Sequence, residues 1–205
     1  MTGNETEPFT PDDADWDAWS PQVIARHLAG VAVPWYVVGG WAIDLFLGGS
    51  HRAHDDLEIA VPHARFGEMT AALPDLDFFV VGDARAWPLD GAGSAFDAHH
   101  QTWGRERASG RYRLDVFREP SADGHWVYRR DHQLRLPYDR IILQTADGIP
   151  YARPEIAVFF KAKGGRPKDE ADFDAVRPKL GADACRWLSD ALDLVYPGHP
   201  WRAPL

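Results

Sequence analysis

The chain has 205 residues, 45% of them hydrophobic and 12% aromatic, which is enough for one compact domain or one domain with a small helical appendix. Its apolar runs are too short for a membrane span, its N-terminus lacks the features of a signal peptide, and a single cysteine, Cys185, excludes a disulfide framework, so a cytoplasmic protein is expected. The formal charge of −9 argues against broad capture of nucleic acid but is compatible with a cationic small molecule or with simple solubility.

The first residues with a clear structural pattern follow a polar, acidic stretch. Residues 1–15 are rich in turn formers and predict a mobile tail. Ser20 before Pro21 is typical of a helix N-cap with proline at the first helical position, and Pro34 ends the helix that follows. The next expected elements are a strand over 35–38, a turn at Gly39-Gly40, a helix over 41–47 ended by Gly48-Gly49, a strand over 57–61, a helix over 62–73 and a strand over 78–81.

The second half of the chain changes character at Arg153-Pro154. Residues 82–110 lack a sustained period and predict hairpins and functional loops, whereas residues 111–117 alternate as a strand. Shorter strands are expected over 126–128 and 140–143, and helices over 155–163, 168–180 and 182–195. The sequence therefore predicts an α/β (α+β) fold, with a small mixed sheet flanked by helices over 16–152 and a helical C-terminal subdomain over 153–205.

Two acids interrupt the apolar strand over 57–61. Because residues two apart face the same way in a strand, Leu57, Ile59 and Val61 are expected on the core face, and Asp56 and Glu58 on the other. Their backbones would lie roughly 7 Å apart, so the two side chains can converge on one cation. Taken alone, the pair fits an edge strand that shows acids to water equally well.

The strand over 111–117 supplies a third acid, Asp115. If this strand lies beside the first, Asp115 joins Asp56 and Glu58, and three carboxylates around one point suit Mg²⁺. A pair of such ions is the usual clamp for displacement at phosphorus. An ion pair between Asp115 and Arg113 or Arg118 is the alternative interpretation.

The glycine pair Gly39-Gly40 stands at a strand-to-helix turn. Glycine lets backbone N–H groups approach a phosphate closely, and the helix N-terminus adds a favourable dipole. Phosphate-binding backbone together with metal-binding carboxylates predicts a nucleoside triphosphate as co-substrate.

These residues carry a family resemblance. The run 39-GGWAIDLFLG-48, followed by Arg52, His54 and 56-DLE-58, resembles the nucleotidyltransferases of the DNA polymerase β superfamily, and within it the aminoglycoside 2″-nucleotidyltransferases and lincosamide-modifying enzymes. The segment 153-RPEIAVFFKAKGGRPKDEADF-173 is similar to the helical segment of the same relatives. The resemblance implies the nucleotidyltransferase fold over 16–152.

The resemblance also implies roles for individual residues. Asp56, Glu58 and Asp115 would be the catalytic and metal-ligating carboxylates for two Mg²⁺ ions, with Asp115 as the candidate general base. The nucleotide phosphates would be held by Gly39, Gly40, Arg52 and Lys161. Glu58 stands where relatives more often have aspartate, and the extra methylene keeps ligation possible while shifting the metal.

Several other polar residues have open interpretations. Asp44 is expected to pair with Arg52 or to cap a loop. His54, next to the acids, is expected to be a hydrogen-bonded structural histidine, with a general base as the alternative. The pair His99-His100 and Trp103 fit an acceptor pocket or an exposed loop equally well. The acids in 168-KDEAD-172 are explained by the positive end of a helix dipole.

The expected reaction is transfer of a nucleoside monophosphate, AMP from ATP, to a hydroxyl of a small molecule with release of pyrophosphate. The acidic charge favours a cationic, aminoglycoside-like acceptor over a nucleic acid, and the sequence leaves the oligomeric state open. The alternatives are a nucleotidyltransferase toxin or regulator that modifies tRNA or protein, and a non-catalytic relative that binds a nucleotide or a drug.

Overall fold

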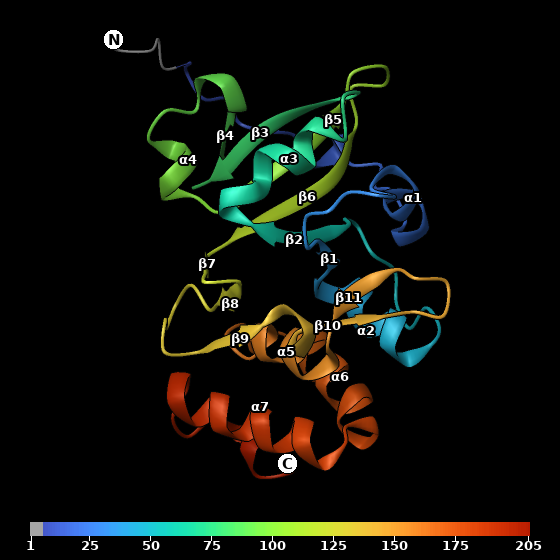
Figure 1. Cartoon of the computed structure of the whole chain (residues 1–205), viewed down its shortest axis with the longest axis vertical. Helices are drawn as coiled ribbons and strands as arrows, with labels where there is room; N and C mark the ends of the chain where they lie inside the picture. Colours follow the sequence, from blue (N-terminus) through green and yellow to red (C-terminus); the bar gives the residue numbers. More distant parts are fainter. Residues whose placement is uncertain (1–5) are drawn as a thin grey trace. The chain divides into compact units, whose positions relative to one another are not determined.

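The computed structural model describes residues 6–205 and divides them into two compact units (Figure 1). Unit 1 contains the described residues up to Trp35 and then His54–Pro120. Unit 2 contains Tyr36–Ala53 and Ser121–Leu205. Each unit is therefore built from two separate stretches of sequence. The fold is mixed α/β with helices beside mixed sheets, as predicted.

Unit 1 holds five sheet strands in the order β2-β6-β5-β3-β4. They are β2 (Glu58–Pro62), β6 (Tyr112–Glu119), β5 (Gln101–Glu106), β3 (Leu76–Gly82) and β4 (Arg85–Pro88). The pair β2·β6 is parallel and the other pairs are antiparallel. From Ile59 to Pro62, β2 is buried throughout, because a parallel strand is covered on both faces and has few positions for polar residues.

The helices of unit 1 are short. Those longer than one 3₁₀ turn are α1 (Pro21–His27), α3 (Phe66–Ala71) and α4 (Ala95–Ala98), and the 3₁₀ turns are η1 (Asp13–Asp15), η2 (His63–Arg65) and η3 (Leu89–Gly91). The Ser20 hydroxyl accepts a hydrogen bond from the Val23 N–H, so the predicted N-cap of α1 is confirmed. The helix expected over 62–73 is shorter, because Pro62 is the last residue of β2 and a 3₁₀ turn precedes α3. Figure 1 shows α3 in front of the sheet, with α1 and α4 toward opposite sides of it.

The predicted tail over 1–15 lies partly outside the described residues. Of the part that the structure describes, Phe9 forms an antiparallel bridge with Ala86, and Thr6 donates its N–H to the Gly91 carbonyl. Farther along, Trp16 bridges to Tyr112. The segment before α1 thus adds backbone hydrogen bonds to the edge strand β4, to η3 and to the first residue of β6.

Unit 2 combines small sheets with the larger helices. Its strands form the orders β10-β11-β1 and β7-β8-β9. They are β1 (Tyr36–Val37), β7 (Ser121–Ala122), β8 (His125–Val127), β9 (Arg135–Pro137), β10 (Ile142–Gln144) and β11 (Pro150–Ala152). The helices are α2 (Gly39–Leu47), α5 (Pro154–Lys161), α6 (Pro167–Val176) and α7 (Ala182–Val195), with 3₁₀ turns η4 (Tyr138–Arg140), η5 (Arg177–Lys179) and η6 (Pro200–Arg202).

The helix α5 is the centre of unit 2. It contacts α2, α6 and α7, and Phe159 and Phe160 on it meet Trp126 and Tyr128 of the β8 region. Because five of the seven residues after Pro154 are apolar, α5 is buried along nearly its whole length. Among the residues that the structure describes, no helix is long and apolar enough to span a bilayer.

Candidate active site

The three predicted carboxylates meet in unit 1. Ligand oxygens of Asp56, Glu58 and Asp115 all lie within 4.8 Å of one another. The parallel register of β2 and β6 pairs Glu58 with Asp115, and the Asp115 N–H donates to the Leu57 carbonyl at 2.8 Å. Asp56 lies two residues before Glu58 and therefore on the same face. The convergence expected from the sequence is present, and a role in metal binding stays a prediction.

Asp115 is the most buried of the three. Its exposed fraction is 1%, whereas Asp56 and Glu58 are half-buried. Burial, and then the nearby Glu58 and Asp56 carboxylates, raise the pKa of Asp115 well above its usual range, whereas the neighbouring Gln101 and Trp103 side chains act in the opposite direction. Three carboxylates this close repel one another unless a proton or a cation lies among them.

One oxygen of Asp115 is held by the protein and the other is not. Gln101 donates from Nε2 to Asp115 Oδ2 at 2.5 Å. The second oxygen, Oδ1, is buried and has no hydrogen-bond partner within the described chain. A buried carboxylate oxygen left without a partner is costly, so an all-oxygen donor set of this kind fits a hard divalent cation such as Mg²⁺.

Gly39 and Gly40 form the first turn of α2 in unit 2, so the helix begins at the glycine pair rather than after it. Gly39 has φ 62°, in the left-handed region that favours glycine, and Val38 before it is extended. No side chain caps this N-terminus. Gly48, also left-handed at φ 79°, ends the helix as predicted.

Lys161 and Arg52 belong to a charged network in unit 2. Lys161 Nζ lies 2.8 Å from Asp172 Oδ2 and 3.7 Å from Asp169 Oδ1, and Arg52 Nε lies 3.6 Å from Asp172 Oδ1. Arg166 makes two further hydrogen bonds to Asp169, of 2.8 and 3.1 Å. Two buried aspartates of α6 thus hold three cationic side chains. The expected role of Arg52 and Lys161 at phosphates stays a prediction.

The residues with open interpretations lie in separate environments. Asp44 accepts a hydrogen bond from the His51 N–H at 3.2 Å, which matches the expected loop-capping role. Trp103 packs against Trp16 and Tyr112 in an aromatic cluster. The His100 ring stacks on Phe117 with ring centroids 5.4 Å apart.

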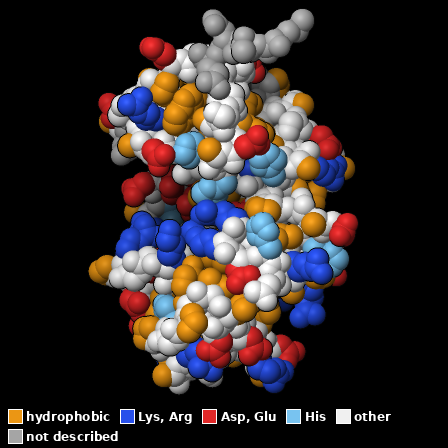
Figure 2. Space-filling view, turned by 90° about the vertical axis from the view of Figure 1, so that its left-hand side faces the viewer, with side chains coloured by type: hydrophobic (Ala, Val, Ile, Leu, Met, Phe, Trp, Pro, Cys, Tyr) orange, Lys and Arg blue, Asp and Glu red, His pale blue; other side chains and the backbone are white. Residues whose placement is uncertain are grey.

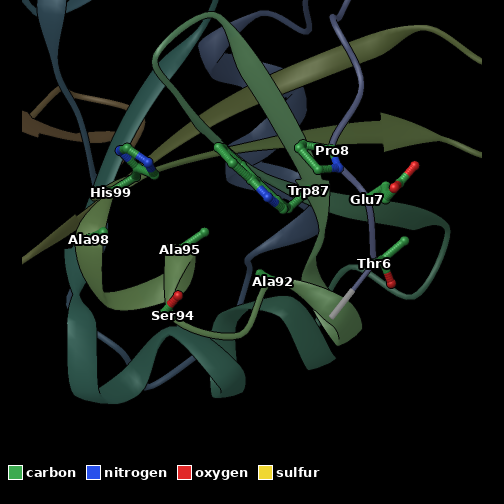
Figure 3. A pocket seen from close by; sticks show the side chains of 9 residues that line it. All are labelled: Thr6, Glu7, Pro8, Trp87, Ala92, Ser94, Ala95, Ala98 and His99. Carbon is green, nitrogen blue, oxygen red and sulfur yellow. The ribbon is translucent and has the colours of Figure 1, made fainter. Parts of the chain in front are cut away.

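A separate pocket of about 440 Å³ opens in unit 1 (Figure 3). It is lined by Thr6, Glu7, Pro8, Trp87, Ala92, Ser94, Ala95, Ala98 and His99. The Trp87 and His99 rings stack with centroids 5.4 Å apart. Figure 2 shows acidic and histidine side chains on the face that carries α4, where His63 approaches Asp97 and His99 approaches Asp83. None of the three converging carboxylates lines this pocket.

Two features of the site were not predicted. Gln101 lies within residues 82–110, for which hairpins and functional loops were expected without bounds, because 101-QTWGRE-106 has Trp103 as its one large apolar residue and shows no clear alternation. Asp169 and Asp172 were explained by the helix dipole, although their spacing of three places both on one face of α6, where they can share partners.

The chain has recognisable relatives. Residues 22–110 match the model of a family described as aminoglycoside-2''-adenylyltransferase. No curated protein sequence matches the chain.

Solved structures with the same fold cover most of the chain. The solution structure of the antibiotic-resistance factor ANT(2'')-Ia is 20% identical, with a TM-score of 0.57, and the match covers 86% of this chain and 92% of that one. The crystal structure of ANT(2'')-Ia in complex with adenylyl-2''-tobramycin is 21% identical, with a TM-score of 0.57 and coverage of 86% and 98%. The lincomycin-bound lincosamide antibiotic adenylyltransferase LnuA is 17% identical, with a TM-score of 0.54 and coverage of 78% and 98%. The match over residues 22–110 and the shared fold support the expected resemblance: part of this chain is similar to the aminoglycoside-2''-adenylyltransferases, and the chain has the fold of the nucleotidyltransferase structures that it matches.

Proposed function

We propose that this protein is a Mg²⁺-dependent nucleotidyltransferase that moves a nucleoside monophosphate, AMP from ATP, to a hydroxyl of a small aminoglycoside-like molecule. The observation that carries the proposal is the meeting of Asp56, Glu58 and Asp115 within 4.8 Å, in a chain whose relatives are adenylyltransferases. The antibiotics named for ANT(2'')-Ia and LnuA support a small hydroxylated acceptor.

The carboxylates have defined tasks in this proposal. Asp56, Glu58 and Asp115 would ligate the metal, and two Mg²⁺ ions when bound would neutralise phosphate charge and acidify the acceptor hydroxyl. Asp115 would also accept the proton of that hydroxyl. Its burial supports this task, because desolvation disfavours the charged form of a carboxyl and therefore favours uptake of the proton.

In this proposal, the N-terminus of α2 and the basic side chains of Arg52 and Lys161, all in unit 2, bind the nucleotide phosphates. The uncapped α2 N-terminus at Gly39 and Gly40 offers N–H donors. Arg52 and Lys161 would add positive charge, which their aspartate partners on α6 keep ordered. The net charge of −9 favours a cationic acceptor.

A pyrophosphate-release assay tests the proposal. The protein is incubated with Mg-ATP or Mg-GTP and a panel of aminoglycosides and lincosamides, and transfer is verified by the mass of the modified acceptor. Asp56→Ala should remove turnover while the melting temperature stays near that of the unsubstituted protein. Asp55→Ala is the matched control, because Asp55 is the exposed neighbour and should leave turnover intact.

Two results would contradict the proposal. Retained turnover in Asp56→Ala would remove this residue from the reaction. Calorimetric binding of nucleotide or drug by the unsubstituted protein, with no pyrophosphate released across the whole panel, would indicate a binding protein instead.

A further inference from the structure

The side chain of Gln101 is directed at the cluster of Asp56, Glu58 and Asp115, through Asp115. Its Nε2 donates to Asp115 Oδ2 at 2.5 Å, and the other oxygen, Oδ1, is buried without a hydrogen-bond partner among the described residues. One half of the carboxylate is therefore fixed by the protein, and the other half is left for a ligand. An acid held in this way presents one oxygen in one orientation.

The sheet register explains the reach of Gln101. In the antiparallel pair β5·β6, Trp103 is opposite Asp115 and Gln101 is opposite Phe117. Gln101 is thus the diagonal neighbour of Asp115, at a separation that long side chains can bridge across a sheet face. Asparagine is one methylene shorter, so it would not make the same contact.

The residues on both sides of Gln101 are held by Arg118. The Arg118 N–H donates to the His100 carbonyl at 2.8 Å. Its guanidinium donates to the His99 carbonyl at 2.5 Å and to the Thr102 hydroxyl at 3.0 Å. Arg118 is 1% exposed, so these bonds form in a dry environment. Gln101 is therefore presented from an anchored strand end.

The donor that contacts Asp115 carries no charge. An arginine or lysine in the same place would pair with the carboxylates and compete with a cation for them. A neutral amide orients the carboxylate and leaves the negative charge of the cluster available. Partners of this kind, which hold a metal ligand in place, affect metal affinity by about 10–100-fold in other proteins.

We propose that Gln101 is a positioning residue that holds Asp115 so that its free oxygen faces the shared metal position of Asp56 and Glu58. The inference rests on the proposed function, because it assumes that the three carboxylates bind a divalent cation. It assigns Gln101 no contact with nucleotide or acceptor.

The experiment measures Mn²⁺ binding to the full chain without nucleotide, by the loss of the free-ion electron paramagnetic resonance signal. Gln101→Leu and Gln101→Asn should each raise the Mn²⁺ dissociation constant by about tenfold or more. Gln22→Leu, which changes an exposed glutamine of α1, should leave it within twofold. Melting temperatures in chelator establish that each variant is folded, and either glutamine variant serves if the other does not fold.

A double-mutant cycle separates positioning from a general structural effect. In an Asp115→Asn background, Gln101→Leu should change Mn²⁺ affinity by less than twofold, because the group it positions is gone. Unchanged affinity in the single glutamine variants would overturn the inference, as would an equal loss in both backgrounds. If the unsubstituted protein does not bind Mn²⁺, or binds it no more tightly than Asp56→Ala does, then the three carboxylates do not form a metal site. The inference about Gln101 would then fail together with that part of the proposed function.

Discussion

At the scale of single residues, the buried Asp115 carboxyl lowers the free energy of unfolding of the metal-free protein at neutral pH. Its pKa is raised in the folded state by burial and by Glu58 and Asp56, so folding favours the protonated form. As pH rises through the unfolded-state pKa of the carboxyl, the unfolded chain loses this proton while the folded chain keeps it. Stability of the metal-free protein therefore falls with rising pH until the folded pKa is passed.

Replacing Asp115 with asparagine should remove that cost. In chelator at pH 7, Asp115→Asn should be more stable to urea than the unsubstituted protein, because asparagine has no carboxyl whose charged form is disfavoured by burial and by Glu58 and Asp56. This difference in stability should shrink toward pH 3.5, where the Asp115 carboxyl of the unsubstituted protein is largely protonated in both the folded and the unfolded state. Mg²⁺ should stabilise the unsubstituted protein and have little effect on the variant. A stability difference that is independent of pH would contradict this account.

Arg118 differs from Asp115, because its buried guanidinium donates hydrogen bonds to several partners. Besides His99 and Thr102 it donates to the Phe96 carbonyl at 2.6 Å, and its guanidinium lies 3.8 Å from the Phe96 ring centroid. Burial lowers its pKa to about 10, so it stays protonated at neutral pH. Arg118→Met should cost about 2–4 kcal/mol in urea unfolding, because it leaves the buried Thr102 hydroxyl and two partly buried carbonyls without their donor. Arg85→Met, at an exposed position of β4, is the control and should change stability by less than about 0.5 kcal/mol.

The sequence predicted the acids of the site and missed the amide beside them. Asp56, Glu58 and Asp115 interrupt apolar alternation, and a charge in such a place stands out. Gln101 carries no charge, and the acid it contacts lies fourteen residues further along the chain on another strand. Only the strand register brings the two together, and register between distant strands cannot be read from local pattern.

At the scale of elements, α6 is held to the rest of unit 2 by charge as well as by apolar packing. Lys161 on α5 and Asp172 on α6 are both about 8% exposed and lie 2.8 Å apart. Asp172→Asn would leave Lys161 buried with less compensation, and should cost about 3 kcal/mol in urea unfolding. The same change at Asp174, which is exposed on the same helix, should cost less than about 0.5 kcal/mol. Equal effects of the two substitutions would show that the buried network adds nothing specific.

Elements were predictable where local signals agree. The Ser20-Pro21 start of α1, the Gly48 end of α2 and the bounds of α7 were all anticipated from caps and periodicity. The bounds of β5 could not be placed within the hairpins and loops expected over 82–110, because its register shifts between Gly104 and Arg105, which breaks the alternation of faces. A side chain at Gly104 would come within 2.9 Å of Leu76 Cδ1, so glycine there reflects packing rather than a loop.

At the scale of the whole molecule, the division into units does not follow the order of the sequence. The segment Tyr36–Ala53 belongs to unit 2, although unit 1 sequence stands on both sides of it. Its helix α2 contacts α5 and α6, and Ile43 on it is 1% exposed. Local patterns give the class of each element but not the long-range contacts that decide which elements share a core. The change to helical character at Arg153-Pro154 predicted a helical subdomain over 153–205, and that boundary stays a prediction.

Two fragments distinguish a unit made of residues 36–53 and 121–205 from an independent helical subdomain over 153–205. Residues 153–205 alone lack both α2 and the aromatic residues Trp126 and Tyr128 that pack on α5, so they should stay largely unfolded in circular dichroism. A chain that joins residues 36–53 to 121–205 through a flexible Gly/Ser linker of about fifteen residues should fold with a cooperative urea transition. Ile43→Asn in that chain is the matched control and should abolish the transition, because it buries an amide in the contact of α2 with α5. Cooperative folding of 153–205 by itself would instead support an independent helical subdomain.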